Sequence, residues 1–205
     1  VVLAYKDKFT FKKIELWKKI FVAFLPIGII AFIFSKQIKA LFSVDVVATM
    51  FIIGGVVFLI AEKYYKPKEH FINDVEKVSY KQAFLIGCAQ LAGLVPGTSR
   101  SGSTIIGSLF LGVSRKAAAE FSFFLGIPVL MGAGLLDMYK MRHELHTQDM
   151  EVLGVGIVVA FISALVVIRA LIRYVSKHDF SAFAYYRIIF GLFILLTWGT
   201  GWVHW

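Results

Sequence analysis

The sequence predicts an all-α fold, a polytopic bundle of helices in a lipid bilayer that forms a single membrane domain over residues 1–205. Of the 205 residues, 59% are hydrophobic and only 17% are charged, against roughly half and a quarter in soluble domains. The mean hydropathy is +0.77, and the apolar residues come in blocks that approach the about 20 residues a helix needs to cross a bilayer. The net charge of +9 does not indicate nucleic-acid binding, because the basic residues lie between the apolar blocks, where they set topology and attract anionic lipid.

Five apolar segments are predicted membrane spans; the first two are short, but Phe and Ile neighbours extend them, and modest tilt or thinning of the bilayer absorbs the mismatch. Pro26 and Pro128 fall inside two of them, where neighbouring helices satisfy the carbonyl groups that a proline leaves free. The predicted spans are residues 20–34, 46–61, 117–139, 152–172 and 182–202.

The stretch between the second and third spans has a different pattern. Its apolar pieces, residues 83–95 and 103–113, hold 13 and 11 residues, which is too few for either to cross as a helix. They flank a polar loop, residues 96–102, that contains Arg100. Irregular backbone at membrane depth is tolerated where protein or a polar cavity surrounds it. The pattern therefore predicts a re-entrant helix-loop-helix hairpin over residues 83–113.

The distribution of lysine and arginine tests this arrangement. If the hairpin enters and leaves on one side, the cytoplasmic segments hold 16 Lys or Arg and the outer segments hold 4. Counting the hairpin as a single crossing leaves 15 against 5, so the positive-inside rule favours the hairpin. The cytoplasmic segments are then residues 6–19, 62–81, 113–117 and 169–180, and the outer ones are residues 35–45 and 140–151.

The polar loop has the composition of an anion site. Pro96 ends the first half-helix and Gly97 allows a tight turn, while Ser101 or Gly102 is predicted to cap the helix that follows. The free N–H groups and the positive dipole end at that helix start attract an anion. Arg100 adds a fixed charge whose forked donors match phosphate oxygens. The loop Pro96-Gly97-Thr98-Ser99-Arg100-Ser101-Gly102 is therefore predicted to bind a phosphate or a pyrophosphate.

Structural interpretations of the buried charges stand beside this one. In one of them Arg100 extends its charged end to the membrane surface or pairs with a buried acid such as Glu120. Placing an arginine so deep in the membrane costs at least a few kcal/mol, however, which favours a functional role. Glu120 and Arg187, both within spans, are predicted either to pair with each other or to brace the loop. The sequence offers no nucleophile beside the loop, because Cys88 lies 12 residues before Arg100 in an apolar run and no histidine occurs between Arg100 and His143.

Residues outside the loop extend the pattern along the chain. They are Lys66-Pro67-Lys68, Tyr80-Lys81-Gln82-Ala83-Phe84, Thr104, Leu111-Gly112-Val113-Ser114-Arg115, Ala118, Glu120-Phe121-Ser122-Phe123, Pro128 and Tyr186-Arg187. With these and the 96–102 loop, the sequence resembles the undecaprenyl pyrophosphate phosphatase family, the bacitracin-resistance proteins, over essentially its whole length.

The resemblance implies a multi-pass enzyme of the bacterial cytoplasmic (inner) membrane whose active site is open to the outer face. Such an enzyme removes the terminal phosphate of undecaprenyl pyrophosphate, which recycles the lipid carrier for cell-wall synthesis and gives resistance to bacitracin. The expected partners are a polyprenyl pyrophosphate lipid and the bilayer; no nucleic acid is expected, and a homodimer is left open. The implied catalytic residues are Arg100 and Ser99, the phosphate-binding residues are Gly97, Thr98, Ser99, Arg100, Ser101, Gly102 and Thr104, and Glu120 and Arg187 are expected to support them.

The resemblance also implies a divalent metal such as Mg²⁺ or Ca²⁺. Members of the family have an earlier hairpin with a Glu-rich motif and a Pro-Val-Ser-Ser-Thr-Gly-His segment, expected to hold the metal-binding carboxylates and the attacking or base residues. Nothing in residues 1–95 matches that motif, so these groups are expected to precede Val1, and no metal ligand is predicted within this sequence. The remaining half of the site resembles one arm of an inverted-topology repeat.

A second class of function fits the same pattern. Hairpins that meet near the middle of the bilayer are a transporter design, so a transporter or flippase for polyprenyl phosphate or another anion is the alternative. A purely structural membrane subunit does not account for Arg100. A Glu-rich hairpin upstream of Val1 would distinguish the enzyme from the transporter.

Overall fold

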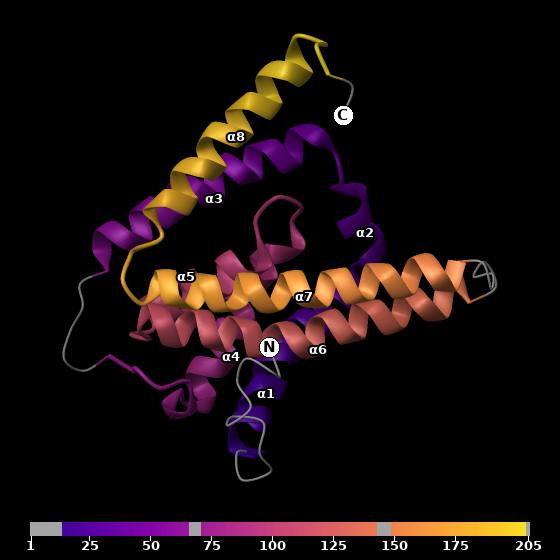
Figure 1. Ribbon diagram of the computed structural model, residues 1–205. Coiled ribbons are helices and arrows are strands. Elements are labelled where there is room, and N and C mark those ends of the chain that lie inside the picture. Colours follow the sequence, from indigo (N-terminus) through magenta and orange to yellow (C-terminus); the bar gives the residue numbers. More distant parts are fainter. Residues whose placement is uncertain (1–13, 66–70, 143–148, 204–205) are drawn as a thin grey trace.

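The computed structural model describes residues 14–65, 71–142 and 149–203, which are helical apart from short turns and connections (Figure 1). Lys66-Pro67-Lys68 and His143 lie outside these residues. The α-helices are α1 (Ile14–Ile33), α2 (Ser35–Ala40), α3 (Val44–Tyr64), α4 (Tyr80–Ala89), α5 (Arg100–Phe110), α6 (Arg115–Met141), α7 (Asp149–Val175) and α8 (Ser181–Gly199), and two short 3-10 helices are η3 (Val75–Lys77) and η4 (Gln90–Leu94).

The five long helices, α1, α3, α6, α7 and α8, coincide with the five predicted apolar segments, and each is long and apolar enough to cross a membrane. The predicted all-α membrane fold is therefore confirmed. α1 begins before its predicted span because residues 14–19 are amphipathic: Leu16 is buried while Lys18 is exposed. Residues 35–40, predicted only as part of an outer connection, form the short helix α2.

Glycines allow α3 and α8 to lie side by side along much of their length (Figure 1). A Cβ added at Gly55 would lie 2.7 Å from the carbonyl oxygen of Ala184, and one at Gly191 would lie 2.8 Å from the carbonyl oxygen of Ala48. Small residues are the usual means of close helix packing in membranes, where no hydrophobic effect drives helices together. This pairing places the α8 side chains that face α3 next to the hairpin.

The hairpin consists of α4, η4, a turn at residues 95–99 and α5. α4 starts sharply because Ser79 and Gln82 form a capping box, in which each side chain accepts from the other residue's N–H group. The two arms touch at Gly107, where an added Cβ would lie 2.5 Å from the Cβ of Ala89. Neither arm has the length of a spanning helix, since α4 has 10 residues and α5 has 11.

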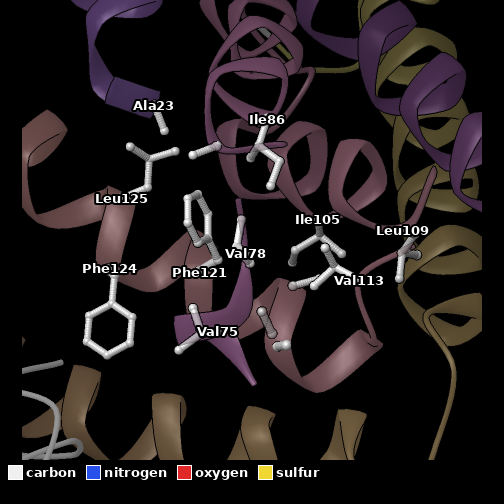
Figure 2. Close-up of a cluster of buried hydrophobic side chains, with 14 of the residues drawn as sticks. Ala23, Val75, Val78, Ile86, Ile105, Leu109, Val113, Phe121, Phe124 and Leu125 are labelled. Carbon is white, nitrogen blue, oxygen red and sulfur yellow. The ribbon is translucent and has the colours of Figure 1, made fainter. Parts of the chain in front are cut away.

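Apolar side chains of both hairpin arms pack against α1 and α6. Figure 2 shows part of this core, in which Ile86 of α4 and Ile105 of α5 lie near Phe121 and Leu125 of α6. α1 approaches α4 so closely that a Cβ at Gly87 would lie 2.3 Å from the Ala23 carbonyl oxygen. The hairpin is thus enclosed by protein on several sides, which irregular backbone at membrane depth requires.

Both ends of the hairpin lie at the same end of the molecule. The connection before α4 meets the one after α5, because Ile72 donates to the carbonyl of Gly112 and Ser114 donates to that of Ile72, each at 3.0 Å. Glu62 at the end of α3 binds Arg115 at the start of α6, and it also accepts from the N–H of Phe180, just before α8. Segments for which charge counting predicts one cytoplasmic side therefore gather at one end.

The tip of the hairpin lies well away from that end. A Cβ at Gly97 would lie 2.3 Å from the carbonyl oxygen of Val47. Val47 is about 20 Å along α3 from Glu62, at about 1.5 Å per residue of helix. The tip therefore meets α3 near the opposite end of that helix, within the length of the span.

Candidate functional site

The backbone of the 96–102 loop turns sharply at two residues with positive φ. Gly97 has a φ of 89° and Ser99 has a φ of 77°. At Gly97 the left-handed conformation and the contact with Val47 both require the absence of a side chain. At Ser99 the same conformation is unfavourable for a residue with a Cβ, and such strain concentrates at functional sites.

Ser99 is the N-cap of α5. Its Oγ accepts a hydrogen bond of 3.1 Å from the N–H of Gly102, and its carbonyl oxygen accepts from Ser103. The prediction that Ser101 or Gly102 caps this helix is therefore wrong, because the positive φ of Ser99 lets the helix begin already at Arg100. Arg100 and Ser101 consequently belong to the first helical turn, whose N–H groups have no acceptor within the helix and carry the positive end of its dipole.

The Arg100 side chain lies between η4 and α6. Its Nη1 donates to Oε1 of Gln90 and to the carbonyl oxygen of Ser122, both at 3.4 Å. Gly126 leaves room for the guanidinium, since an added Cβ would lie 2.9 Å from Nη2. These two acceptors are neutral, whereas the alternative interpretation paired Arg100 with Glu120. Neither the Gln90 carboxamide nor the Ser122 carbonyl neutralises the positive charge of Arg100.

Thr104, which the resemblance predicts as a phosphate-binding residue, lies against α6. It is fully buried, and its Oγ1 lies 2.7 Å from the Oγ of Ser122 and 2.9 Å from the carbonyl oxygen of Ser101. Ser122 therefore contacts both Thr104 and Arg100. This arrangement makes Thr104 a brace between the first turn of α5 and α6.

Arg187 joins the loop to the α3–α8 pair. Its Nη2 donates to the carbonyl oxygens of Gly97 at 2.6 Å, Thr98 at 3.1 Å and Met50 at 3.2 Å. Its guanidinium also lies 4.6 Å from the centre of the Phe51 ring, a cation–π contact. Of the two predicted roles for Arg187, the structure shows contact with the loop. Glu120 is buried in α6, 6% exposed.

Three buried side-chain atoms among the described residues have no hydrogen-bond partner: Nε2 of Gln90, Oγ1 of Thr98 and Nε of Arg187. Thr98 belongs to the loop, and the other two side chains are bonded to it through Arg100 and Gly97. Buried polar groups are nearly always paired, so each exception needs an explanation. Their gathering around one loop marks that loop as the functional region.

A cavity of about 280 Å³ lies beside the loop. Ser99, Ser101 and Gly102 line it together with Arg187, and the rest of its lining is largely aromatic, including Phe51, Phe58, Phe180, Phe183 and Tyr186. Hydroxyls and a guanidinium thus border an apolar space. Such a cavity suits a ligand with an anionic head and an apolar chain.

The described residues do not form a metal centre. No group of three or more His, Cys, Asp or Glu side chains in residues 14–65, 71–142 and 149–203 is placed to hold a metal ion. These residues therefore supply no set of ligands for the divalent metal that the resemblance implies, and we assign the metal no step.

The sequence alone predicts no role in the site for two of its residues. Gln90 and Ser122 both contact Arg100, yet they lie 10 and 22 residues from it. The only sequence signal for Gln90 is a carboxamide in the middle of an apolar run, which is unusual in a segment that lies in a membrane.

Comparison with known proteins shows the family of this chain. Residues 2–193 match the family described as bacitracin resistance protein BacA. An undecaprenyl-diphosphatase of Methanococcus aeolicus is 48% identical over 196 residues, covering 96% of this chain and 76% of the relative. That of Sulfurimonas denitrificans is 51% identical, covering 96% and 77%, and undecaprenyl-diphosphatase 1 of Acinetobacter baylyi is 54% identical, covering 90% and 67%. The chain therefore belongs to the bacitracin resistance protein BacA family.

Proposed function

We propose that this multi-pass membrane protein is an undecaprenyl-diphosphatase, which hydrolyses undecaprenyl pyrophosphate to undecaprenyl phosphate and inorganic phosphate. Water supplies the oxygen for the released phosphate, and the P–O bond to the remaining phosphate breaks. The reaction recycles the lipid carrier of cell-wall synthesis and confers resistance to bacitracin. Relatives with this name are 48% and 51% identical to the chain over the aligned residues, which favours hydrolysis over the transport of an anion.

The 96–102 loop is proposed to hold the pyrophosphate. The observation that carries this assignment is Arg100, held by two neutral acceptors at the N-terminus of α5. A guanidinium and a helix N-terminus together stabilise the charge that develops on phosphoryl oxygens. The hydroxyls of Ser99 and Ser101, which border the cavity, are proposed to donate to the phosphate, while Gly97, Thr98 and Gly102 shape the loop. Arg187 and Thr104 hold its backbone, and Glu120, buried in α6, is proposed to support it.

The position of the hairpin favours a site that opens on the outer face of the cytoplasmic membrane. Both ends of the hairpin lie at the end of the molecule that is predicted to be cytoplasmic, while Gly97 lies near the other end of α3.

We also propose a requirement for a divalent cation such as Mg²⁺ or Ca²⁺. It is tested by loss of phosphate release with EDTA and recovery of that release on adding metal. A homodimer stays a prediction.

Phosphate release from undecaprenyl pyrophosphate by the complete protein in detergent tests this function. Arg100→Ala should lower turnover by about 10²- to 10³-fold, the usual cost of removing a donor that stabilises developing charge. Arg100→Lys should recover part of the loss, because an ammonium keeps the charge but not the forked geometry. Arg173→Ala, at an exposed position near the end of α7, is the control. A well-folded Arg100→Ala protein with normal turnover would show that the loop is not the phosphate site.

A further inference from the structure

Gln90 is a fully buried polar side chain whose hydrogen-bonding capacity is only partly used. It begins η4, in the first arm of the hairpin, and is 0% exposed. Its Oε1 accepts from Nη1 of Arg100 at 3.4 Å, while its Nε2 has no partner. A buried carboxamide with an unpaired amino group weakens folding in comparison with an apolar side chain of the same shape. Stability does not explain this residue.

The orientation of the carboxamide follows from Arg100. Exchanging its oxygen and nitrogen would bring an NH₂ group against a guanidinium, and both groups only donate. The oxygen must therefore face Arg100, which leaves the nitrogen without a partner. The unpaired nitrogen is thus a consequence of placing an acceptor next to the arginine.

The two acceptors hold one end of the guanidinium from opposite sides. Gln90 approaches Nη1 from η4, and the carbonyl oxygen of Ser122 approaches it from α6. Nη1 carries two hydrogens, so these acceptors account for both. The described residues provide no hydrogen-bond acceptor for Nε and Nη2 of Arg100, which form the side edge of the fork. That edge has the geometry for two parallel hydrogen bonds to a phosphate.

The neutrality of Gln90 matters as much as its position. A glutamate here would also accept from Nη1, but its charge would neutralise the cation in a region of low dielectric. An apolar residue would leave the charge intact and free the guanidinium to rotate. Among these choices, only an uncharged acceptor fixes the guanidinium of Arg100 and leaves its full positive charge available to an anion.

We propose that Gln90 is the positioning residue of the phosphate site, where its carboxamide oxygen fixes Nη1 of Arg100 and so sets the orientation of the guanidinium that binds the pyrophosphate. This role rests on the proposed function of Arg100. Under this proposal Gln90 increases turnover but decreases the stability of the fold. A residue retained for structure would contribute to both in the same direction.

Opposite effects on stability and turnover are the test. In the complete protein, Gln90→Met keeps the size of the side chain and removes both the acceptor and the unpaired donor. We expect an unchanged or higher apparent Tm, with kcat/KM lower by about 10- to 100-fold, as when a catalytic group is displaced by about 1 Å. Gln90→Glu should also fold and should lose at least as much activity. Thr197→Val, at another buried polar residue far along α8, should leave kcat/KM within about twofold.

The coupling to Arg100 completes the test. In an Arg100→Ala background, Gln90→Met should change the residual activity by less than about twofold, because its effect passes through the arginine. A Gln90→Met protein with a lower Tm and normal kcat/KM would overturn the positioning role while leaving the function of Arg100 intact. An undiminished effect of Gln90→Met without Arg100 would overturn it as well. Normal turnover in Arg100→Ala would instead overturn the phosphate site itself.

Discussion

Nη2 of Arg187 in α8 donates a 2.6 Å hydrogen bond to the carbonyl oxygen of Gly97, 90 residues earlier in the chain, at the tip of the hairpin. The same nitrogen reaches the carbonyl oxygen of Met50 in α3. Arg187 can approach α3 this closely because Gly54 has no side chain, and a Cβ there would lie 2.5 Å from Nη2. One cation thus joins two membrane-spanning helices to the loop proposed to bind phosphate.

Replacing Arg187 should therefore impair both the loop and the enzyme. Arg187→Met removes the charged donor from three carbonyl oxygens, and hydrogen bonds to charged groups contribute about 1.5–3 kcal/mol each. We expect a lower apparent Tm in detergent and phosphate release reduced by about 10- to 100-fold, because the loop is displaced. Arg187→Lys should have a Tm and a turnover between those of Arg187→Met and the wild type. Arg169→Met, at an exposed position in α7, should resemble the wild type. Unchanged Tm and turnover in Arg187→Met would contradict this role.

Ser99 combines an N-cap with a strained backbone, and two substitutions separate these properties. Ser99→Gly relieves the positive φ, and glycine is a tolerated N-cap, so its stability should stay near that of the wild type. Ser99→Ala keeps the strain and loses the cap, which should cost about 1 kcal/mol or more. Both lose the hydroxyl, so phosphate release should fall by roughly fivefold in each, equivalent to about 1 kcal/mol. Thermal denaturation that ranks alanine equal to glycine would disagree with this backbone conformation.

The pair formed by Glu62 and Arg115 should stabilise the end of the molecule opposite the loop. The Glu62 side chain is 6% exposed, and it accepts from Phe180 as well as from Arg115. Glu62→Gln leaves Arg115 without its counter-charge, and breaking a buried pair costs about 3–5 kcal/mol, less here because the Arg115 side chain is 24% exposed. We expect the apparent Tm to fall clearly, whereas Glu15→Gln, which breaks an exposed pair with Lys18, should have little effect. Equal Tm values for the two variants would argue against a stabilising role of the Glu62–Arg115 pair.

Topology can be tested with single cysteines and an impermeant thiol reagent in a Cys88→Ala background. Cysteines replacing the exposed residues Lys77 and Lys116 flank the hairpin and should react from the same, cytoplasmic side. A cysteine replacing Lys36 in α2 should react from the other side. Labelling of positions 77 and 116 from opposite sides would mean that the hairpin crosses the membrane, and the proposed outward-facing site would then be wrong.

The sequence was most informative where a property depends on neighbouring residues in the chain. The five long helices follow from apolar runs, and the two short arms follow from runs of 13 and 11 residues. The position of the N-cap was missed because three hydroxyl residues follow Gly97 closely. Composition does not reveal which of them takes a positive φ, whereas the structure shows that Ser99 does. Thr104 is a predicted phosphate-binding residue, and only the structure shows that its hydroxyl contacts Ser122 of α6.

By itself the sequence determined that this is a helical membrane protein, that residues 96–102 are polar within an apolar hairpin, and that Arg100 is the charge in that loop. These are consequences of hydrophobicity and run length, which act locally along the chain. Only the tertiary structure decided what Arg100 and Arg187 contact. Gln90, Ser122 and Gly97 become their partners because helix packing brings these segments together, and burial then requires polar groups to bond with whatever acceptor lies within reach.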